Sequence, residues 1–343
     1  MSLAYYGFIV DTIAGDGASE NRATFKSLAT ITAREVLSKV WTEDELKDLP
    51  LDFKIAFPHP HPLYRKHVMV IVGGEMPHWG KKFRNAFDNK TRSLVFRGME
   101  MNLKMIHEMW KCTDDYSITS SAHVRLYKFT RDHFVLNAYL KMRVFLALQI
   151  PSQTTIKMIK DHCETFGIDV AKYQPMIDLF NSVDRLVDIM NGKAFQGSKD
   201  KNVQLIDCPK HSHITELFDI LRLFEEWKEE SGGFTKKFIT KQTYEDLVWM
   251  VFGVAAHAVL YLKDDKSRVM HQGRSGTDFL EHFFAKLRYI NSNPTMQQSR
   301  EAASKVSSDV GMESRAFERS RGNSGTAPSQ TTAGDLLAPI EKD

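Results

Sequence analysis

The chain has 343 residues, of which 42% are hydrophobic and 26% are charged, and its formal net charge is +3. These proportions are typical of a folded globular protein with room for two domains, and they exclude a chain that is disordered throughout. The net charge is too small to indicate nucleic-acid binding by itself, so any phosphate-binding surface has to be local.

The cysteines and the apolar runs indicate the compartment. Cys112, Cys163 and Cys208 lie too far apart for a disulfide framework, which favours a reducing environment. The N-terminus does not have the basic-then-apolar layout of a signal peptide. The longest apolar run, Val248 to Leu262, is shorter than the roughly 20 residues that a membrane span needs. We therefore expect this run to be a buried core helix in a protein that does not enter a membrane.

The first 75 residues predict a strand, a helix and a second strand. Ala4 to Ala14 is a mostly apolar run that ends at a Gly-Asp-Gly turn, and Val68 to Val72 is a second one that ends at Gly73-Gly74. Residues 19–41 have helical spacing, and a strand–helix–strand order predicts a parallel pair in an α/β sheet. Residues 56–64 contain three prolines, so we expect an extended loop there.

From about residue 95 the pattern becomes helical, and no further strand is predicted. Helices are expected in the following segments: 102–110, 133–150, 173–192, His213 to Glu230, Gln242 to Leu262, and a last one from Asp278. Residues 196–201 form a polar loop. Beyond residue 305 the composition is Ser, Gly, Thr, Ala and Arg without periodicity, which predicts a disordered tail.

Two carboxylates are candidate metal ligands. Asp16 follows a buried parallel strand, and ligands bind at the carboxyl ends of such strands. Taken alone, however, the Asp-Gly dipeptide favours an ordinary turn. Glu281 lies beside the apolar stripe of the last helix, with Asp278 as a possible N-cap. The local pattern there favours a capping box over a site.

Several segments resemble P element-like and THAP-domain DNA transposases in the order of that family. GDGASENRATFKSLA (15–29) resembles the strand and turn that deliver the second catalytic Asp, and RSGTDFLEHFFAKLRYINSNPT (274–295) resembles the closing Asp-x-x-Glu-x-Phe-Phe segment. Between them, MVIVGGEMPHWGKKFRNAF (69–87), FTRDHFVLNAYLKMRVFLALQIPS (129–152) and FITKQTYEDL (238–247) also match in order. The likeness covers about residues 4–305.

The resemblance implies an α/β RNase H-like fold, with a parallel or mixed sheet, interrupted by a helical insertion. The implied boundaries are 1–95 for the first RNase H-like part, 96–236 for the insertion, 237–304 for the closing helices and 305–343 for the tail. Asp16 and Glu281 would be the second and third residues of an acidic triad that holds Mg²⁺ or Mn²⁺. Two such ions catalyse in-line displacement at phosphorus when carboxylates hold them about 4 Å apart.

The first catalytic Asp of the family lies on an earlier strand, and this chain begins just before the second. Asp11 cannot replace it, because its odd spacing from Asp16 directs it to the other face of the strand. The family's zinc-coordinating DNA-binding domain also has no counterpart here. We therefore expect this polypeptide alone not to catalyse transposition. The alternative to a transposase fragment is a domesticated, non-catalytic scaffold that binds DNA, a nucleotide or a protein.

The resemblance also implies a GTP-binding insertion, in which GTP is a cofactor for assembly. The matching positions are a cationic contact, a base-packing residue, an Asp-x-x-Asn pair and a contact from the closing helix: Lys128, Val144, Asp188, Asn191 and Asp278. An Asp can accept hydrogen bonds from N1 and N2 of guanine. The alternative is that Asp188 and Asn191 belong to a solvated polar stripe, which their helical spacing would equally explain.

DNA is the expected partner, and the chain offers a local basic segment. Lys81 to Arg97 holds six cations against one Asp, which could bind the phosphates of transposon ends or could simply be solvated surface. His78 could lie near the metal site, although a structural hydrogen bond is the plainer reading. Cys208, His211 and His213 do not have a fourth ligand at zinc spacing, which favours chance. The expected location is the nucleus, and homo-oligomerisation is left open.

Overall fold

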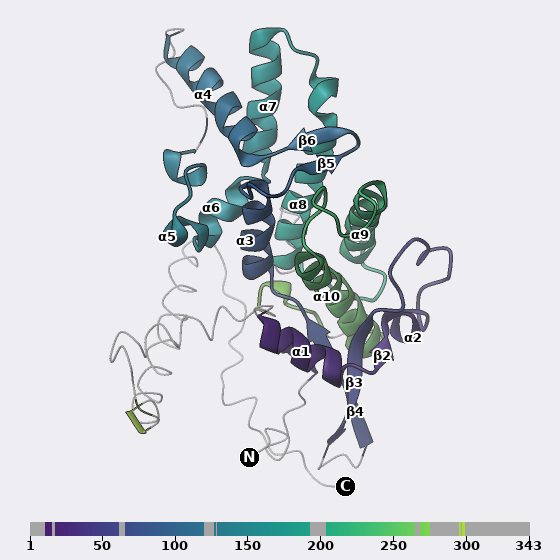
Figure 1. Cartoon of the computed structure of the whole chain (residues 1–343). Coiled ribbons are helices and arrows are strands. Elements are labelled where there is room, and N and C mark those ends of the chain that lie inside the picture. The colour runs from purple at the N-terminus through teal and green to yellow at the C-terminus, as the bar shows by residue number, and fades with distance from the viewer. Residues whose placement is uncertain are drawn as a thin grey trace, which may run out of the picture. The chain divides into compact units, whose positions relative to one another are not determined.

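The structure is a computed structural model that describes residues 11–15, 18–61, 66–119, 127, 129–192, 204–264, 268–274, 295 and 297–298 (Figure 1). The chain divides into two compact units, Met1–Thr277 and Asp278–Asp343. The elements described below belong to the first unit. The predicted disordered tail, 305–343, lies outside the described residues.

A four-stranded mixed sheet has the order β1-β4-β3-β2. It is built from β1 (Thr12–Ala14), β2 (Ile31–Thr32), β3 (Lys54–His61) and β4 (Lys66–Gly73). The first strand pairs with β4 in parallel, with Thr12 opposite Ile71, as the strand–helix–strand pattern predicts. The other two pairs are antiparallel. The chain is thus an α/β protein, with one parallel pair inside a mixed sheet.

The proline-rich segment is a strand, so the prediction of a loop at 56–64 was wrong. Pro58 lies opposite Met69 in the antiparallel pair of β3 and β4. The carbonyl of Ala56 accepts a hydrogen bond from Thr30 N, on the β2 side. Residues two apart along a strand face the same way, so the Pro58 nitrogen also faces away from β4. The short β2 does not extend that far, and a proline on an open edge removes no ladder bond.

The single helix predicted over 19–41 is divided in two. It consists of α1 (Ser19–Leu28), the short β2, and α2 (Ala33–Leu37). The β-branched run Thr30-Ile31-Thr32 favours extended backbone. Thr32 then starts a new helix through a capping box, in which its side chain accepts from Glu35 N and its backbone N–H donates to the Glu35 carboxylate.

A short hairpin joins the sheet to the helices, where no strand was predicted beyond residue 95. It pairs β5 (Leu94–Phe96) with β6 (Met99–Met101). Both loop residues have positive φ, 46° at Arg97 and 76° at Gly98. A two-residue loop with this geometry matches the twist of antiparallel strands.

Most of the remaining helices fall in segments predicted to be helical, whereas the helix over 153–166 was not predicted. After α3 (Met76–Phe87) they are α4 (Leu103–Thr119), α5 (Ala138–Lys141), α6 (Val144–Gln149), α7 (Gln153–Phe166), α8 (Gln174–Met190) and α9 (Ser212–Glu230), with 3₁₀ turns at Arg131–His133, Val170–Tyr173 and Gln272–Arg274. The expected helix over 133–150 is broken into the two short helices α5 and α6. The last expected helix, from Asp278, lies outside the described residues.

The core is organised around α10 (Lys241–His257), which continues as a π-helical turn, Ala258–Leu262. This is the apolar run that the sequence predicts to be a buried core helix. Among the described residues, Lys241–Leu262 is the only helix whose length and apolar character would suit a membrane span. Of its apolar 18-residue window, however, 83% is buried inside the protein. It packs against β4 and α9 (Figure 1). Its Gly253 permits that contact, since a Cβ there would lie 3.1 Å from the Val72 carbonyl oxygen.

Candidate site at the carboxyl ends of the parallel strands

The two parallel strands end next to each other against the first turns of α10. Gly15 follows β1, and Gly73 and Gly74 complete and follow β4. A Cβ on Gly74 would lie 2.5 Å from the Asp246 carbonyl oxygen, so only glycine allows the strand to approach the helix this closely. On the other side, a Cβ on Gly15 would lie 3.0 Å from the ring of Phe25. The glycines therefore hold the strand ends tightly against α1 and α10.

A small pocket lies between these strand ends and the helices. Its volume is about 10 Å³, which is roughly what one water molecule needs. It is lined by glycines, aromatic rings and three ionisable side chains: Gly15, Phe25, Gly73, Gly74, Glu75, His78, Trp79, Asp246 and Trp249. The carboxyl ends of parallel strands are where α/β proteins bind ligands, so this pocket marks the expected edge of the sheet.

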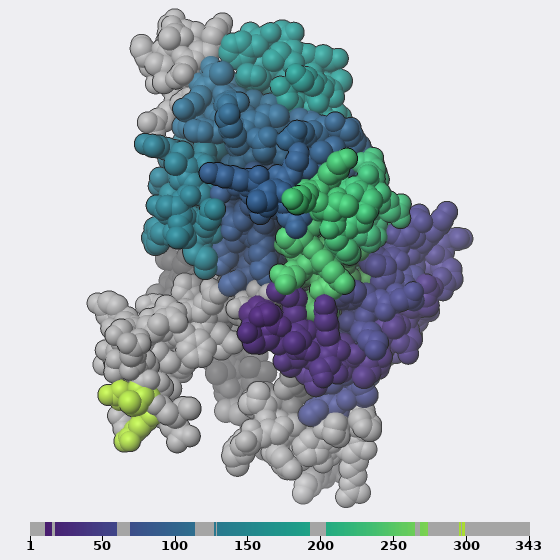
Figure 2. All heavy atoms as spheres, in the orientation of Figure 1, coloured from purple at the N-terminus to yellow at the C-terminus, as the bar shows by residue number. Residues whose placement is uncertain are grey.

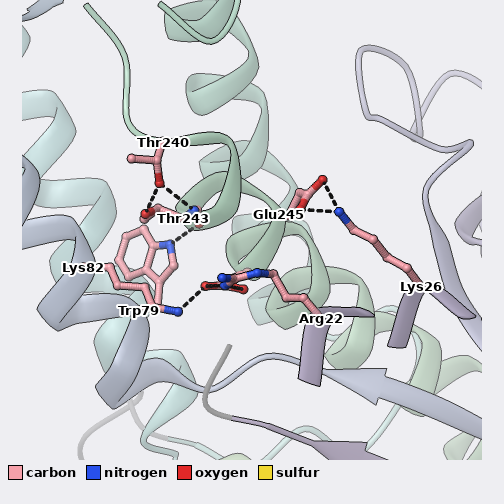
Figure 3. Close-up of polar contacts among 8 residues, drawn as sticks. Arg22, Lys26, Trp79, Lys82, Thr240, Thr243 and Glu245 are labelled. Atoms are coloured by element: carbon pink, nitrogen blue, oxygen red, sulfur yellow. Dashed lines mark hydrogen bonds and ion pairs between the residues drawn. The ribbon is translucent and has the colours of Figure 1, made fainter. Parts of the chain in front are cut away.

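Asp246 binds two cations from two different helices. Its carboxylate accepts from Arg22 of α1 at 3.4 Å and from Lys82 of α3 at 2.8 Å (Figure 3). The Asp246 and Arg22 side chains are nearly fully buried, while Lys82 is about a third exposed. Burial raises the pKa of Asp246, and this outweighs the lowering by Lys82 and Arg22. The three residues form a buried ionic network that joins α1, α3 and α10.

The neighbouring residues on α10 strengthen the same junction. Glu245 accepts two hydrogen bonds from Lys26 of α1, at 2.9 and 2.8 Å (Figure 3). Thr240 caps α10 by accepting from Thr243 N. The Trp79 indole N–H of α3 donates to the Thr243 carbonyl at 3.0 Å. The start of α10 is therefore fixed to both helices that follow the parallel strands.

Glu75 and His78 form the polar side of the pocket. Glu75 immediately follows the two glycines after β4, and its side chain is 1% exposed. The His78 Nε2 atom lies 3.7 Å from a Glu75 carboxylate oxygen. His78 therefore lines the pocket together with Gly15 and Glu75. The expectation that it lies near the metal site stays a prediction, because Asp16 and Glu281 lie outside the described residues.

The predicted catalytic and metal-binding pair, Asp16 and Glu281, lies outside the described residues. Gly15, the residue before Asp16, borders the pocket, and Glu75 and Asp246 are carboxylates in that pocket. No group of three or more His, Cys, Asp or Glu side chains with metal-binding geometry occurs in the part of the chain that the structure describes. The metal assignment therefore stays a prediction.

Three of the five predicted nucleotide-binding residues are described. Val144 is the first residue of α6, Asp188 lies in the last turn of α8, and Asn191 is the C-cap of α8. All three are partly exposed. Lys128 and Asp278 lie outside the described residues.

The polar stripe of α8 consists of Asn181, Asp184, Asp188 and Asn191. Part of it faces another helix. Asn181 accepts from the Gln153 side chain of α7 at 2.9 Å. Burial raises the pKa of Asp184, a hydrogen bond from Gln153 lowers it, and the nearby charge of Asp188 raises it again. The stripe is therefore not a fully solvated face. Asp188 and Asn191, the two predicted nucleotide-binding residues of the stripe, lie at the C-terminal end of α8, beyond the contact with Gln153.

Most cations of the predicted basic segment, Lys81 to Arg97, are bound by other groups of the same chain. Lys82 binds Asp246, while Arg84 is fully buried and donates to the Leu140 and Lys141 carbonyls. Two further arginines behave alike: Arg92 donates to the Thr235 and Phe238 carbonyls, and Arg97 binds Glu226 and Asp178. Little of this segment's charge is available for phosphates, which weakens the DNA-contact interpretation of the run.

His211 of the Cys-Pro-Lys-His-Ser-His stretch has a helix-capping role. The His211 Nδ1 atom accepts from His213 N at 3.1 Å at the start of α9, and the two rings pack edge to face. Burial lowers the pKa of His211. Cys208 is exposed. This geometry accounts for His211 without a metal.

Sequence reasoning missed Glu75, Arg22 and Asp246. Glu75 carried a usable signal, because it follows a predicted strand and a glycine pair, much as Asp16 follows a predicted strand and Gly15. The other two did not, since Arg22 and Asp246 are separated by 224 residues. Only the fold brings them together.

The comparisons with known proteins agree with the resemblance noted in the sequence. No protein-family model matches the chain. It is 26% identical over 262 residues to the transposable element P transposase of Drosophila melanogaster, an alignment that covers 73% of this chain and 30% of that protein. It is also similar to the solved Drosophila P element transposase strand transfer complex, with a TM-score of 0.64, 22% identity, and coverage of 86% of this chain and 59% of that one.

These findings confirm the predicted resemblance to P element-like transposases. The chain spans 30% of the length of the curated relative. The THAP-domain part of the resemblance has no counterpart in either comparison and stays a prediction.

Proposed function

We propose that this chain, which is similar to P element transposase in sequence and fold, acts on DNA as part of a transposase-type RNase H-like catalytic domain. One observation carries the proposal. The similarity runs along 73% of the sequence and 86% of the structure, and in this chain the carboxyl ends of a parallel strand pair meet at a small pocket that Gly15, Glu75 and Asp246 line. The strand transfer complex is a protein–DNA assembly by its name, which supports DNA as the substrate class and the nucleus as the place of action.

In this proposal Asp16 and Glu281 hold Mg²⁺ or Mn²⁺. Both side chains supply hard oxygen ligands and the negative charge that a divalent cation needs. The bound ions would activate the attacking hydroxyl and stabilise the leaving oxygen. The chain's own contribution at this edge is rigidity, because the Arg22–Asp246–Lys82 network fixes the helices that follow β1 and β4.

The DNA proposal is tested with the purified chain and a labelled duplex that carries transposon-end sequence. We expect binding, with phosphate contacts that weaken as salt rises, and we expect no strand cleavage by the 343-residue polypeptide alone in Mg²⁺ or Mn²⁺. Cleavage that is abolished by Asp16→Ala would support the catalytic role and refute the expectation of inactivity. Absence of any DNA binding would refute the proposal.

We further propose that the helical region binds GTP through Lys128, Val144, Asp188, Asn191 and Asp278. The residue types of the described members suit a guanine site. Asp188 offers two acceptor oxygens at the partly exposed end of α8, and Val144 offers an apolar surface. Asn191 is the C-cap of the same helix and is partly exposed.

A GTP titration by calorimetry tests this site. Asp188→Ala is expected to weaken GTP binding at least about tenfold, because a lost charge-assisted hydrogen bond is worth about 1.5–3 kcal/mol. Asn181→Ala is the matched control, since it changes the same helix face two turns away. ATP should bind more weakly than GTP to the unaltered chain. Equal GTP affinity in the Asp188 variant and the control would exclude the site.

A further inference from the structure

The most exposed large apolar side chains in the described part of the chain lie within seven residues of one another. Tyr139, Met142 and Phe145 are 65%, 64% and 65% exposed, whereas the other exposed large hydrophobic residues that the structure describes reach at most 47%. Tyr139 and Met142 are three residues apart, so they lie on the same side of a helical turn. With Arg143 they form what we call the α5–α6 surface.

Arginine and aromatic side chains are combined on this surface. The Arg143 guanidinium lies over the Tyr139 ring, 5.5 Å from its centroid, and its Nη1 donates to the Tyr139 hydroxyl at 2.8 Å. Arg131 is exposed on the preceding 3₁₀ turn. Lys141 is paired with Asp88 at 2.8 Å. Arg143 therefore places a positive charge directly against the Tyr139 ring.

The surface is held rigidly from below. The fully buried Arg84 of α3 donates to the carbonyls of Leu140 and Lys141. Asn137 caps α5 by accepting from Leu140 N. A Cβ on Gly80 of α3 would lie 2.3 Å from Leu148, so α3 and α6 pack closely. α5 and α6 form part of the protein surface in teal on the left of Figures 1 and 2. The exposed tips thus stand on a fixed base.

We propose that the α5–α6 surface binds unpaired nucleotides of single-stranded DNA, with bases stacked on Tyr139 and Phe145 and a phosphate held by Arg143. This rests on the proposed function, in which DNA is the substrate. Every base has a flat face that stacks on an aromatic ring, and arginine adds charge for the backbone. In a duplex the base faces are already stacked, so the exposed rings would have nothing to bind.

A second copy of the chain fits this surface less well. The three apolar side chains together expose roughly 400 Å², while a stable interface buries about 800 Å² on each partner. The positive charge of Arg143 would also repel the same surface of another copy, whereas it complements a polyanion.

The test measures fluorescence anisotropy of a labelled oligothymidine with the full 343-residue chain. Tyr139→Ala and Phe145→Ala are each expected to weaken binding about tenfold, and Tyr139→Phe about twofold or less. Arg143→Gln should reduce the slope of log affinity against log salt by about one. Phe166→Ala, which removes an exposed ring at the end of α7, is the matched control and should change nothing.

Four results would overturn the proposal. The first three are absence of oligothymidine binding by the unaltered chain, binding by the Tyr139→Ala and Phe145→Ala variants that equals that of the unaltered chain, and a monomer–dimer shift in sedimentation caused by those variants without DNA. A fall in GTP affinity parallel to the fall in oligothymidine affinity would also overturn it, because the surface would then belong to the nucleotide site around Val144. Binding of the transposon-end duplex, measured separately, reports whether the proposed function itself fails.

Discussion

In each of two ionic clusters, an acidic residue of α9 or α10 binds a cation of the segment 81–97. One cluster is buried and the other is exposed to solvent. At the sheet edge, Asp246 of α10 holds Lys82 and Arg22, and its carboxylate is 7% exposed. At the hairpin, Glu226 of α9 holds Arg97, and both side chains are about 40% exposed. Burial raises the pKa of Asp246, whereas hydrogen bonding to Arg97 lowers the pKa of Glu226.

The difference shows what each cluster can do. Water screens the hairpin cluster and replaces a lost partner, so it adds little to stability. The buried cluster pays a large desolvation penalty, and losing one partner leaves a charge in the core. The sheet-edge network is therefore a geometric constraint on α1 and α3, the helices that follow the two parallel strands. Its removal should affect the fold far more than removal of the hairpin cluster.

The largest expected effect is that of Asp246→Ala. We expect it to reduce the free energy of unfolding by about 3–5 kcal/mol, because Arg22 would remain buried without its carboxylate. Urea unfolding at pH 7 measures this. Glu245→Ala is the matched control, since its partner Lys26 is half exposed and would be solvated. Its expected effect is about 1 kcal/mol. Equal effects of the two substitutions would contradict the distinction between buried and exposed partners.

The close approach of β4 to α10 should be nearly as sensitive. Gly74→Ala places a Cβ 2.5 Å from the Asp246 carbonyl oxygen and the Met250 Cγ atom, and the backbone atom cannot move aside alone. We expect a loss of about 1–3 kcal/mol in unfolding free energy from the forced backbone shift. Gly98→Ser offers a contrast, since no atom lies within 4 Å of a Cβ there and only its positive φ is unfavourable. A neutral Gly74→Ala variant would show that the strand end is less tightly packed than described.

The hairpin cluster should tolerate substitution better. Arg97→Ala removes the contacts to Glu226 and Asp178, and we expect a loss of no more than about 1 kcal/mol at low salt. The loss should shrink as ionic strength rises, because the pairs are screened by solvent ions. Unfolding of the variant and the unaltered chain at 0.05 and 0.5 M NaCl measures both. A loss of unfolding free energy that exceeds 2 kcal/mol and persists at high salt would mean that the hairpin cluster behaves like the buried one.

Sequence reasoning reached the elements with strong local signals. The strand β4 and the helices α8, α9 and α10 carry continuous apolar patterns and clear ends, such as the glycine pair after α9. It failed where tertiary context decided. The proline nitrogens of β3 face an open edge of the sheet, and only the pairing with β4 shows this. The two strands of the hairpin are three residues long, which is too short for a local pattern.

The sequence places the candidate site at the ends of the parallel strands, and this location stays a prediction because Asp16 and Glu281 lie outside the described residues. What the structure does describe is a pocket at that edge of the sheet, where the residues after β1 and β4 meet. The side chains that fix that edge come from elements far away in sequence: Lys82 and Asp246 are 164 residues apart. No local pattern distinguishes Asp246 from the adjacent Glu245, yet Asp246 binds the buried Arg22 and the partly exposed Lys82, whereas Glu245 binds a half-exposed lysine.

The smallest effect is a pH dependence with opposite signs in the two clusters. The pKa of Glu226 is lowered in the folded chain, so its contribution to stability is present above its unfolded value and is lost as the pH falls through the folded value. Relative to Glu226→Gln, the unaltered chain should lose about 0.3–0.5 kcal/mol of advantage between pH 6 and about pH 3. The pKa of Asp246 is raised, so relative to Asp246→Asn the unaltered chain should gain as the pH falls through the raised value. Urea unfolding of the three proteins across this range gives the two differences. Slopes of the same sign would mean that burial does not separate the two carboxylates.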